Sequence, residues 1–123
     1  MYQTKISGDR LYHAQSQGYG QPVETFGRTE EGETPMSLVN IALASCVTMC
    51  VQGYFAKKWG QDQLPIRLTS DYEAERFSLK LILDFPLDGA SEKELLDYVE
   101  EHCRVKALLK ETIAFDLVVD RSN

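Results

Sequence analysis

The residues most able to carry chemistry are three cysteines, Cys46, Cys50 and Cys103. A cysteine thiolate is a nucleophile, and a second thiol can trap its oxidised form as a disulfide. Cys46 and Cys50 stand one helical turn apart, where Cβ atoms are about 6 Å from each other, whereas a disulfide needs about 3.5–4.5 Å. These two therefore cannot bridge within an intact helix. A disulfide from either one to Cys103 meets no barrier from their separation in sequence.

The local sequence distinguishes Cys103 from Cys46. Cys46 lies in an apolar stretch, where a cysteine usually behaves as a small hydrophobe. Cys103 lies among His102, Arg104 and Lys106, and positive charge on these side chains would stabilise a thiolate. On local sequence alone, Cys103 is the more easily activated thiol.

A zinc site is an alternative use of the same residues, with Cys46, Cys50, His102 and Cys103 as its ligands. Their spacing lacks the paired form of zinc knuckles. His13 falls in a predicted strand and is expected to be a half-buried sheet residue rather than a catalytic base. No glycine-rich phosphate motif is present either. We therefore expect neither a metal nor a cofactor.

The N-terminal part of the chain predicts three strands. Residues 2–6 and 11–15 are rich in strand formers, and residues 7–10 between them have hairpin-turn chemistry. Residues 23–26 predict a third strand, which is followed by a polar loop over residues 27–33.

A long helix is predicted from Thr34 to about Trp59. Thr34 suits the N-cap, Pro35 suits the first helical position, and Gly60 supplies a left-handed stop. Apolar residues cover nearly the whole circumference over residues 38–51. We therefore expect a central helix that is buried on most sides.

Four further elements are predicted after this helix, and the first three are two strands and a helix. Period-two alternation predicts strands over residues 66–74 and 77–85, and their short connection near Glu75 makes them antiparallel. Ser91 and Glu94 form a capping box that begins a second helix.

A final strand is predicted over residues 113–119, and Cys103 closes the apolar stripe of the helix before it. The resulting order, βββ-α-ββ-α-β, predicts a single α+β domain over residues 1–123. We expect a predominantly antiparallel sheet around the long buried helix.

The bulk properties exclude several classes of protein. A net charge of −6 and a pI near 4.9 oppose binding to phosphate backbones and anionic lipid, so we expect no nucleic-acid or membrane partner. The N-terminus lacks the pattern of an export signal, and the apolar stretch over residues 38–51 is too short and too polar to span a bilayer. Three cysteines without the dense pattern of a secreted scaffold indicate a reducing compartment. We therefore expect a cytoplasmic protein.

Two stretches of the chain resemble signatures of the OsmC/Ohr family. In the first, a proline precedes a cysteine in a helical setting of small residues, from Thr34-Pro35 to Ala44-Ser45-Cys46. In the second, a cysteine follows a helix and precedes the last strand, from Glu101-His102-Cys103-Arg104-Val105 to Leu109. The chain length and the order of elements also resemble the family, so the resemblance covers nearly the whole chain.

The resemblance implies an OsmC-like fold and an intertwined homodimer with two sites at the subunit interface. It implies the reduction of an organic hydroperoxide by a peroxidatic cysteine, which the first signature places at Cys46. The second signature places the resolving cysteine at Cys103, which converts the sulfenic acid to a disulfide. A dithiol reductant then resets the pair. Whether Cys50 is a spare thiol or part of this relay stays open.

The chain departs from the family pattern at two positions. Better-studied members have a glutamate directly after the motif proline, where it helps to hold an arginine that activates the thiol, whereas Met36 follows Pro35 here. The family's Cys-Pro-Val proline is replaced by Arg104, which brings a permanent positive charge beside Cys103. The candidate activators of the thiolate are Arg10, Arg28 and Arg104, and the candidate orienting acids are Glu24 and Glu33.

Two alternatives to a peroxidase follow from these observations. In the first, the missing glutamate marks a loss of peroxidase chemistry, and an apolar dimer cleft holds a hydrophobic small molecule. A fast-reacting Cys46 would discriminate against it. The second is an acyl-thioester protein of hot-dog type, but that fold has one main helix. The second helix from Ser91 and the Cys103 signature argue against it.

Overall fold

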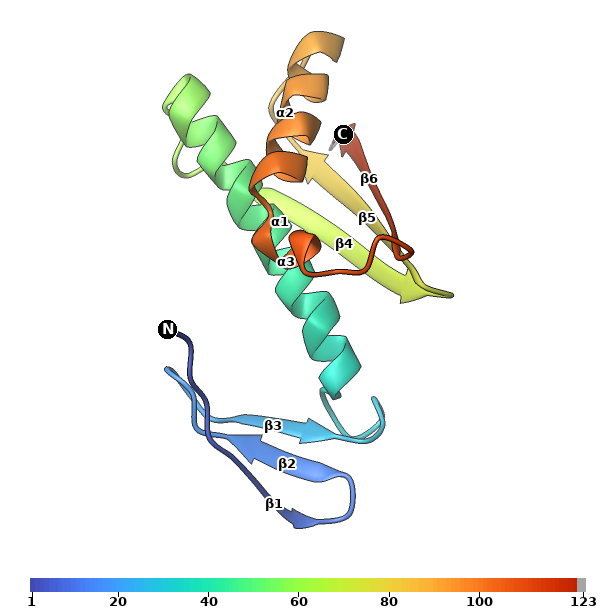
Figure 1. The fold of residues 1–123 in the computed structure, drawn as a ribbon. Helices are drawn as coiled ribbons and strands as arrows, with labels where there is room; N and C mark the ends of the chain where they lie inside the picture. The colour runs from blue at the N-terminus through green and yellow to red at the C-terminus, as the bar shows by residue number, and fades with distance from the viewer. Residues whose placement is uncertain (122–123) are drawn as a thin grey trace. The chain divides into compact units, whose positions relative to one another are not determined.

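The computed structural model describes residues 1–121 and divides into two compact units, Met1–Val39 and the chain from Asn40 onward. The order of elements agrees with the predicted βββ-α-ββ-α-β, with one short helix added before the last strand (Figure 1). The elements are β1 (Ile6–Arg10), β2 (His13–Ser16), β3 (Val23–Phe26), α1 (Pro35–Trp59), β4 (Ile66–Glu73), β5 (Arg76–Leu83), α2 (Gly89–His102), α3 (Arg104–Ala107) and β6 (Ala114–Arg121).

The first unit contains an antiparallel sheet with strand order β1-β2-β3. Its third strand has the predicted bounds. The predicted hairpin turn over residues 7–10 is wrong, because these residues belong to β1 and the chain reverses after Arg10 instead. Tyr12 takes the positive φ of 56° that this turn needs, and a register shift between Ser7 and Arg10 accompanies it. Gly8 favoured a turn over residues 7–10, but the strand continues through this glycine to Arg10.

Both predicted ends of α1 are confirmed. The Ser37 backbone N–H donates to Thr34 Oγ1 at 3.0 Å, and the Thr34 N–H donates to Ser37 Oγ at 2.7 Å. This reciprocal pair satisfies N–H groups that a helix start would otherwise leave open. At the other end, Gly60 adopts a φ of 65°, the left-handed conformation in which a helix commonly stops.

Burial of α1 is narrower than its composition predicts. One face is buried, whereas Ile41 is 46% exposed and Met49 is 66% exposed. By length and composition alone α1 is able to cross a membrane, a test that the core helix of a soluble protein also passes. The prediction that this stretch is too short and too polar to span a bilayer applies to residues 38–51 alone, whereas the whole helix is 25 residues long. Its buried face consists of Leu43, Val47, Val51, Tyr54 and Phe55.

The second unit contains a sheet with strand order β4-β5-β6. The strands β4 and β5 are antiparallel as predicted, and the two residues between them, Ala74 and Glu75, both have positive φ. The last strand departs from the antiparallel expectation, because β6 pairs parallel with β5. Parallel neighbours need a long crossover connection, and the chain through α2 and α3 provides it.

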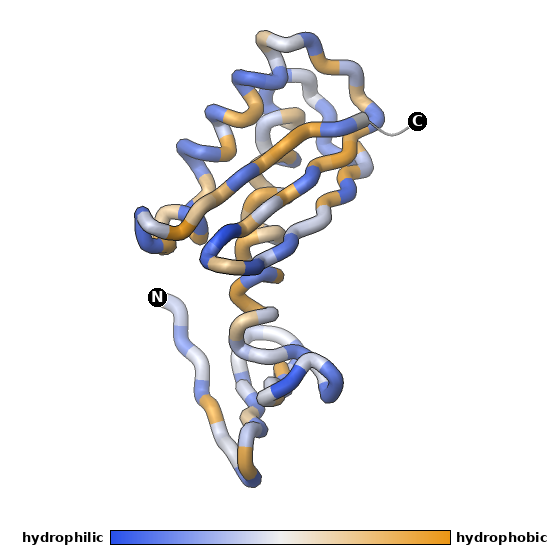
Figure 2. Tube along the Cα trace, turned by 90° about the vertical axis from the view of Figure 1, so that its right-hand side faces the viewer, coloured by the Kyte–Doolittle hydropathy of each residue, from blue (hydrophilic) through white to orange (hydrophobic). Residues whose placement is uncertain are grey.

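The core of this unit lies on one face of the sheet. Along β5 the buried side chains alternate with exposed ones, and the strands of the sheet alternate in hydropathy in the same way (Figure 2). The helices α1 and α2 cover the buried face (Figure 1). The buried residues of β5 are Phe77, Leu79, Leu81 and Leu83, and those of α2 are Leu95 and Val99.

The start of α2 differs from the predicted capping box. Asp88 is the N-cap, and its carboxylate accepts a hydrogen bond from the Ser91 N–H at 2.7 Å. Helix α2 therefore begins before Ser91. Glu94 is consequently free of the capping role and bonds to α1 instead.

Candidate functional site

The three cysteines gather in the second unit, although one of them comes from a distant part of the chain. Cys46 and Cys50 are half-buried on α1 and pack against the core, and Cys103 is buried with 2% of its surface exposed. The thiols lie near enough to influence one another's pKa: Cys46 interacts with both other thiols, and Cys50 also interacts with Cys103. All three are free thiols.

Cys103 owes its place to the junction between α2 and α3. It is the C-cap of α2 and the N-cap of α3, with an extended backbone at φ −76° and ψ 102°. Its N–H donates to the Val99 carbonyl at 2.9 Å and so completes the last turn of α2. One extended residue between two helices changes the direction of the chain. As a result, the N–H groups that begin α3 face the Cys46 sulfur.

These N–H groups decide the protonation of Cys46. Burial by itself raises the pKa of the Cys46 thiol, but the backbone N–H of Val105, the Cys103 thiol and the backbone N–H of Arg104 all stabilise the thiolate. Their combined effect outweighs burial, and the pKa of Cys46 lies below its ordinary value. A lower pKa increases the fraction of thiolate, which is the reactive form of cysteine.

The other two cysteines are shifted in the opposite direction. Burial raises the pKa of Cys103, and the neighbouring Cys46 thiolate raises it further. Burial and the charges of Cys46 and Cys103 raise the pKa of Cys50 to about 12. The ranking expected from local sequence is therefore reversed, since Cys46 is the activated thiol and Cys103 is the one held protonated.

The cationic side chains around Cys103 explain this reversal. The His102 ring stacks on Tyr98 with centroids 4.0 Å apart, and its Nδ1 lies 2.9 Å from the Tyr98 carbonyl. Lys106 Nζ donates to Glu100 at 2.6 Å and lies over the Phe115 ring. The Arg104 residue is exposed and acts on Cys46 through its backbone N–H.

The upstream candidates for activation have partners within the first unit. Arg10 pairs with Asp9 at 3.3 Å, and Arg28 pairs with Glu31 at 3.3 Å. Both arginines therefore have neighbouring carboxylates as ion partners. Their assignment as activators of Cys46 stays a prediction.

The two candidate orienting acids, Glu24 and Glu33, contact groups other than Arg10 and Arg28. Glu24 lies 3.5 Å from His13 Nε2, and Glu33 accepts a hydrogen bond from Ser37 Oγ at 3.0 Å near the start of α1. His13 itself is half-buried in β2, as predicted. The role of either acid at the thiol site also stays a prediction.

The cysteine cluster does not form a metal cage in the part of the chain that the structure describes. Within residues 1–121, no group of three or more His, Cys, Asp or Glu side chains is arranged to hold a metal ion. His102 points its Nδ1 to the Tyr98 carbonyl rather than serving the three thiols as a fourth ligand. The zinc alternative therefore gains no support from the geometry.

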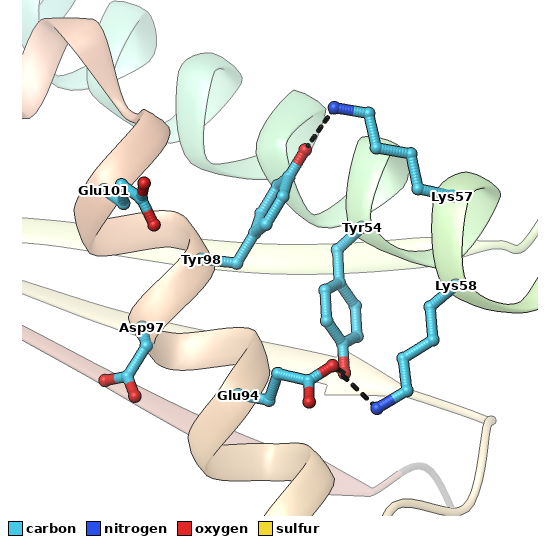
Figure 3. Close-up of a pocket in the computed structure, with 7 residues that line it drawn as sticks. All are labelled: Tyr54, Lys57, Lys58, Glu94, Asp97, Tyr98 and Glu101. Carbon is cyan, nitrogen blue, oxygen red and sulfur yellow. Dashed lines mark hydrogen bonds and ion pairs between the residues drawn. The ribbon is translucent and has the colours of Figure 1, made fainter.

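A separate groove of about 390 Å³ lies between α1 and α2, and none of the three cysteines lines it (Figure 3). Lys58 Nζ donates to Glu94 at 2.6 Å, and the Tyr54 hydroxyl donates to the same carboxylate at 3.0 Å. Lys57 Nζ donates to the Tyr98 hydroxyl at 3.1 Å (Figure 3). These bonds hold α2 against α1 and so support the position of Cys103 at the end of α2.

Fold and site together define an α+β domain in which an activated thiol on a long helix meets a buried thiol at a helix junction. The family model that matches the chain is that of the OsmC-like proteins, over residues 28–118. The chain belongs to this family, and the resemblance seen in its two cysteine stretches is confirmed.

Solved structures have the same fold at low sequence identity. The organic hydroperoxide resistance protein OsmC of Legionella pneumophila is 16% identical, with a TM-score of 0.71 and coverage of 98% of this chain and 96% of that one. OhrB of Bacillus subtilis, an organic hydroperoxide resistance protein, is 15% identical with a TM-score of 0.61 and 98% coverage of both chains. An OsmC-like protein of Mycoplasma pneumoniae is 14% identical with a TM-score of 0.71, covering 99% of this chain and 96% of that one. No curated protein sequence matches the chain.

Proposed function

We propose that the protein is a thiol peroxidase that reduces organic hydroperoxides, with Cys46 as the peroxidatic and Cys103 as the resolving cysteine. One observation carries this proposal: a thiol with a lowered pKa lies within reach of a second thiol that is buried and held protonated. A thiolate is needed for the attack on the peroxide, and a neighbouring thiol is needed to remove the product.

The reaction runs in three steps. The Cys46 thiolate attacks one peroxide oxygen, so that an S–O bond forms, the O–O bond breaks and an alcohol leaves after taking up a proton. The Cys103 sulfur then attacks the Cys46 sulfenic acid, and the disulfide forms as water leaves with the Cys103 proton. An external dithiol returns two electrons by thiol–disulfide exchange.

The two departures from the family pattern support a different means of activating the Cys46 thiol. The glutamate expected after Pro35 is absent, and the family proline after the second cysteine is Arg104. A proline has no backbone N–H, whereas Arg104 has one and directs it to the Cys46 sulfur. The chain thus gains a hydrogen-bond donor to the thiolate at the position where it departs from the family.

Similar structures support the substrate class. Two of the solved structures with this fold are called organic hydroperoxide resistance proteins. The site itself lies among core apolar residues, which favours an alkyl hydroperoxide over hydrogen peroxide.

We propose further that the active form is a homodimer. Within residues 1–39, which the structure describes throughout, no residue belongs to the buried core, and Ile6 of β1 is 62% exposed. A three-stranded sheet needs another surface to cover it, and α1 has an exposed apolar side that includes Ile41 and Met49. A second copy of the chain would cover both kinds of surface.

The test is stopped-flow oxidation of the reduced protein by cumene hydroperoxide and by hydrogen peroxide. We expect a rapid reaction that prefers the organic peroxide and ends in a Cys103 disulfide. Cys46→Ser should abolish the fast phase, and Cys103→Ser should keep it but stop at the sulfenic acid, which dimedone labels. Oxidation no faster than that of a free thiol would refute the proposal and favour a protein that binds a hydrophobic small molecule.

A further inference from the structure

Cys50 is a third thiol at the proposed site, and the peroxidase reaction does not use it. It lies one turn after Cys46 on α1, and its pKa is influenced by both Cys46 and Cys103. It is half-buried and packs against the same core as Cys103. The structure thus places a third thiol in the same cluster as the two sulfurs of the disulfide that would form in the reaction.

We propose that Cys50 takes over the disulfide, so that the oxidised protein comes to rest with a Cys50–Cys103 bond and a free Cys46. This inference rests on the proposed function for its first oxidation step. The Cys50 sulfur attacks the Cys103 sulfur of the Cys46–Cys103 disulfide, one S–S bond forms, and one S–S bond breaks. Cys46 leaves as a thiolate and the proton of Cys50 passes to solvent, so that no further oxidant or reductant is consumed.

Helix geometry determines which sulfur Cys50 attacks. Attack on the Cys46 sulfur would require a Cys46–Cys50 disulfide, but the two residues belong to one continuous helix from Pro35 to Trp59. Their Cβ atoms, about 6 Å apart at this spacing, are too distant for the bond. Cys103 belongs to another element and is free of this restriction. Cys50 can therefore attack only the Cys103 sulfur of the disulfide.

The same environment that activates Cys46 favours the exchange. In thiol–disulfide exchange the thiol with the lower pKa is the better leaving group, and the equilibrium favours its release as thiolate. At Cys46 the backbone N–H groups of Val105 and Arg104 act against burial and, with its neighbours, lower the pKa, whereas at Cys50 burial is the largest cause and raises the pKa. Neither burial nor these N–H groups depends on a charge at Cys103, so both persist in the disulfide. The disulfide that leaves Cys46 free is therefore the more stable of the two.

The consequence concerns the reductant. With Cys50–Cys103 as the resting oxidised form, the external dithiol attacks that bond and not one that includes Cys46. Cys46 is meanwhile a free thiolate without its resolving partner. A second hydroperoxide would then convert it to a sulfenic acid that persists until the dithiol restores Cys103.

The position of Met49 allows a direct test. Cyanogen bromide cleavage after Met49 separates Cys46 from the fragment that contains both Cys50 and Cys103. Reduced protein is oxidised with diamide, equilibrated, blocked with N-ethylmaleimide in acid, cleaved, and analysed by mass spectrometry without reduction. A Cys50–Cys103 bond releases the Cys46 fragment, whereas a Cys46–Cys103 bond keeps it attached. We expect release to exceed retention by a factor on the order of ten or more.

A parallel oxidation with one equivalent of cumene hydroperoxide follows the exchange in time. We expect the attached form first and the released form later, and in Cys50→Ser the fragment should stay attached throughout. Retention of the Cys46 fragment at equilibrium in the wild-type protein would overturn the inference and leave the proposed function intact. Failure of the peroxide to oxidise any thiol, together with release after diamide, would instead refute the peroxidase and support the exchange.

Discussion

The backbone N–H of Val105 faces the sulfur of Cys46, although the two residues belong to α3 and α1 and are separated by two strands and a helix in sequence. The junction at Cys103 produces this approach, since it ends α2 and begins α3 in an extended conformation. A single junction therefore delivers both the second thiol and the donors that activate the first one.

The first prediction concerns the pH dependence of thiol modification. Because burial is outweighed by N–H donors at Cys46, its pKa is lowered and its thiolate survives to lower pH than those of Cys50 and Cys103, whose pKa values are raised. Brief iodoacetamide pulses should therefore modify Cys46 half-maximally at a lower pH than they modify Cys50 or Cys103. Cleavage after Met49 again separates the products. Preferential labelling of Cys103 in mild acid would contradict the assignment.

The second prediction separates the backbone of Arg104 from its side chain. Arg104→Pro removes one N–H beside Cys46, and proline fits there because Arg104 is the first residue of α3 and Cys103 before it is extended. We expect alkylation of Cys46 at neutral pH to slow by a factor on the order of 3–10. Arg104→Ala keeps the N–H and should leave the rate nearly unchanged. The opposite ranking of the two variants would assign activation to the guanidinium.

The third prediction concerns the turn between β4 and β5. Ala74 and Glu75 have φ of 51° and 60°, a conformation that costs an L-residue about 1–2 kcal/mol. Glu75→Gly should therefore raise the free energy of unfolding by about 1 kcal/mol in urea titrations. The control is Ser78→Gly, exposed within β5, which should lower it by about 0.5–1 kcal/mol. Equal effects of the two glycines would show that the turn is unstrained.

Much of the fold could be predicted because the signals are local. Thr34, Pro35 and Gly60 define α1 through the chemistry of helix ends, and the alternation of β4 and β5 gives their strands directly. Where two local signals compete, the prediction was wrong. Asp88 caps α2 in place of Ser91, because both residue types are good N-caps and only the loop path selects one.

The parallel pairing of β6 was beyond prediction, since the direction of a strand depends on where its crossover leads it. The two family signatures predicted the thiol pair with Cys46 as the peroxidatic cysteine, whereas the local sequence ranked Cys103 as the more easily activated thiol. Residue types around Cys103 indicated that cationic side chains activate this thiol. In the structure it is Cys46 whose pKa is lowered, and the backbone N–H of Val105 contributes to that shift. A backbone donor has no signature in the residue type. The one usable signal was the replacement of the family proline by Arg104, which restores an N–H.

The place of Cys103 in the crossover between β5 and β6 also has a consequence for biosynthesis. The strand β5 can pair with β4 through a two-residue turn as soon as both are made, but its pairing with β6 closes a long loop and forms late. Cys103 comes to Cys46 within that loop. Because Cys103 follows β4 and β5 in sequence, a newly made chain can pair these two strands before Cys103 is able to meet Cys46.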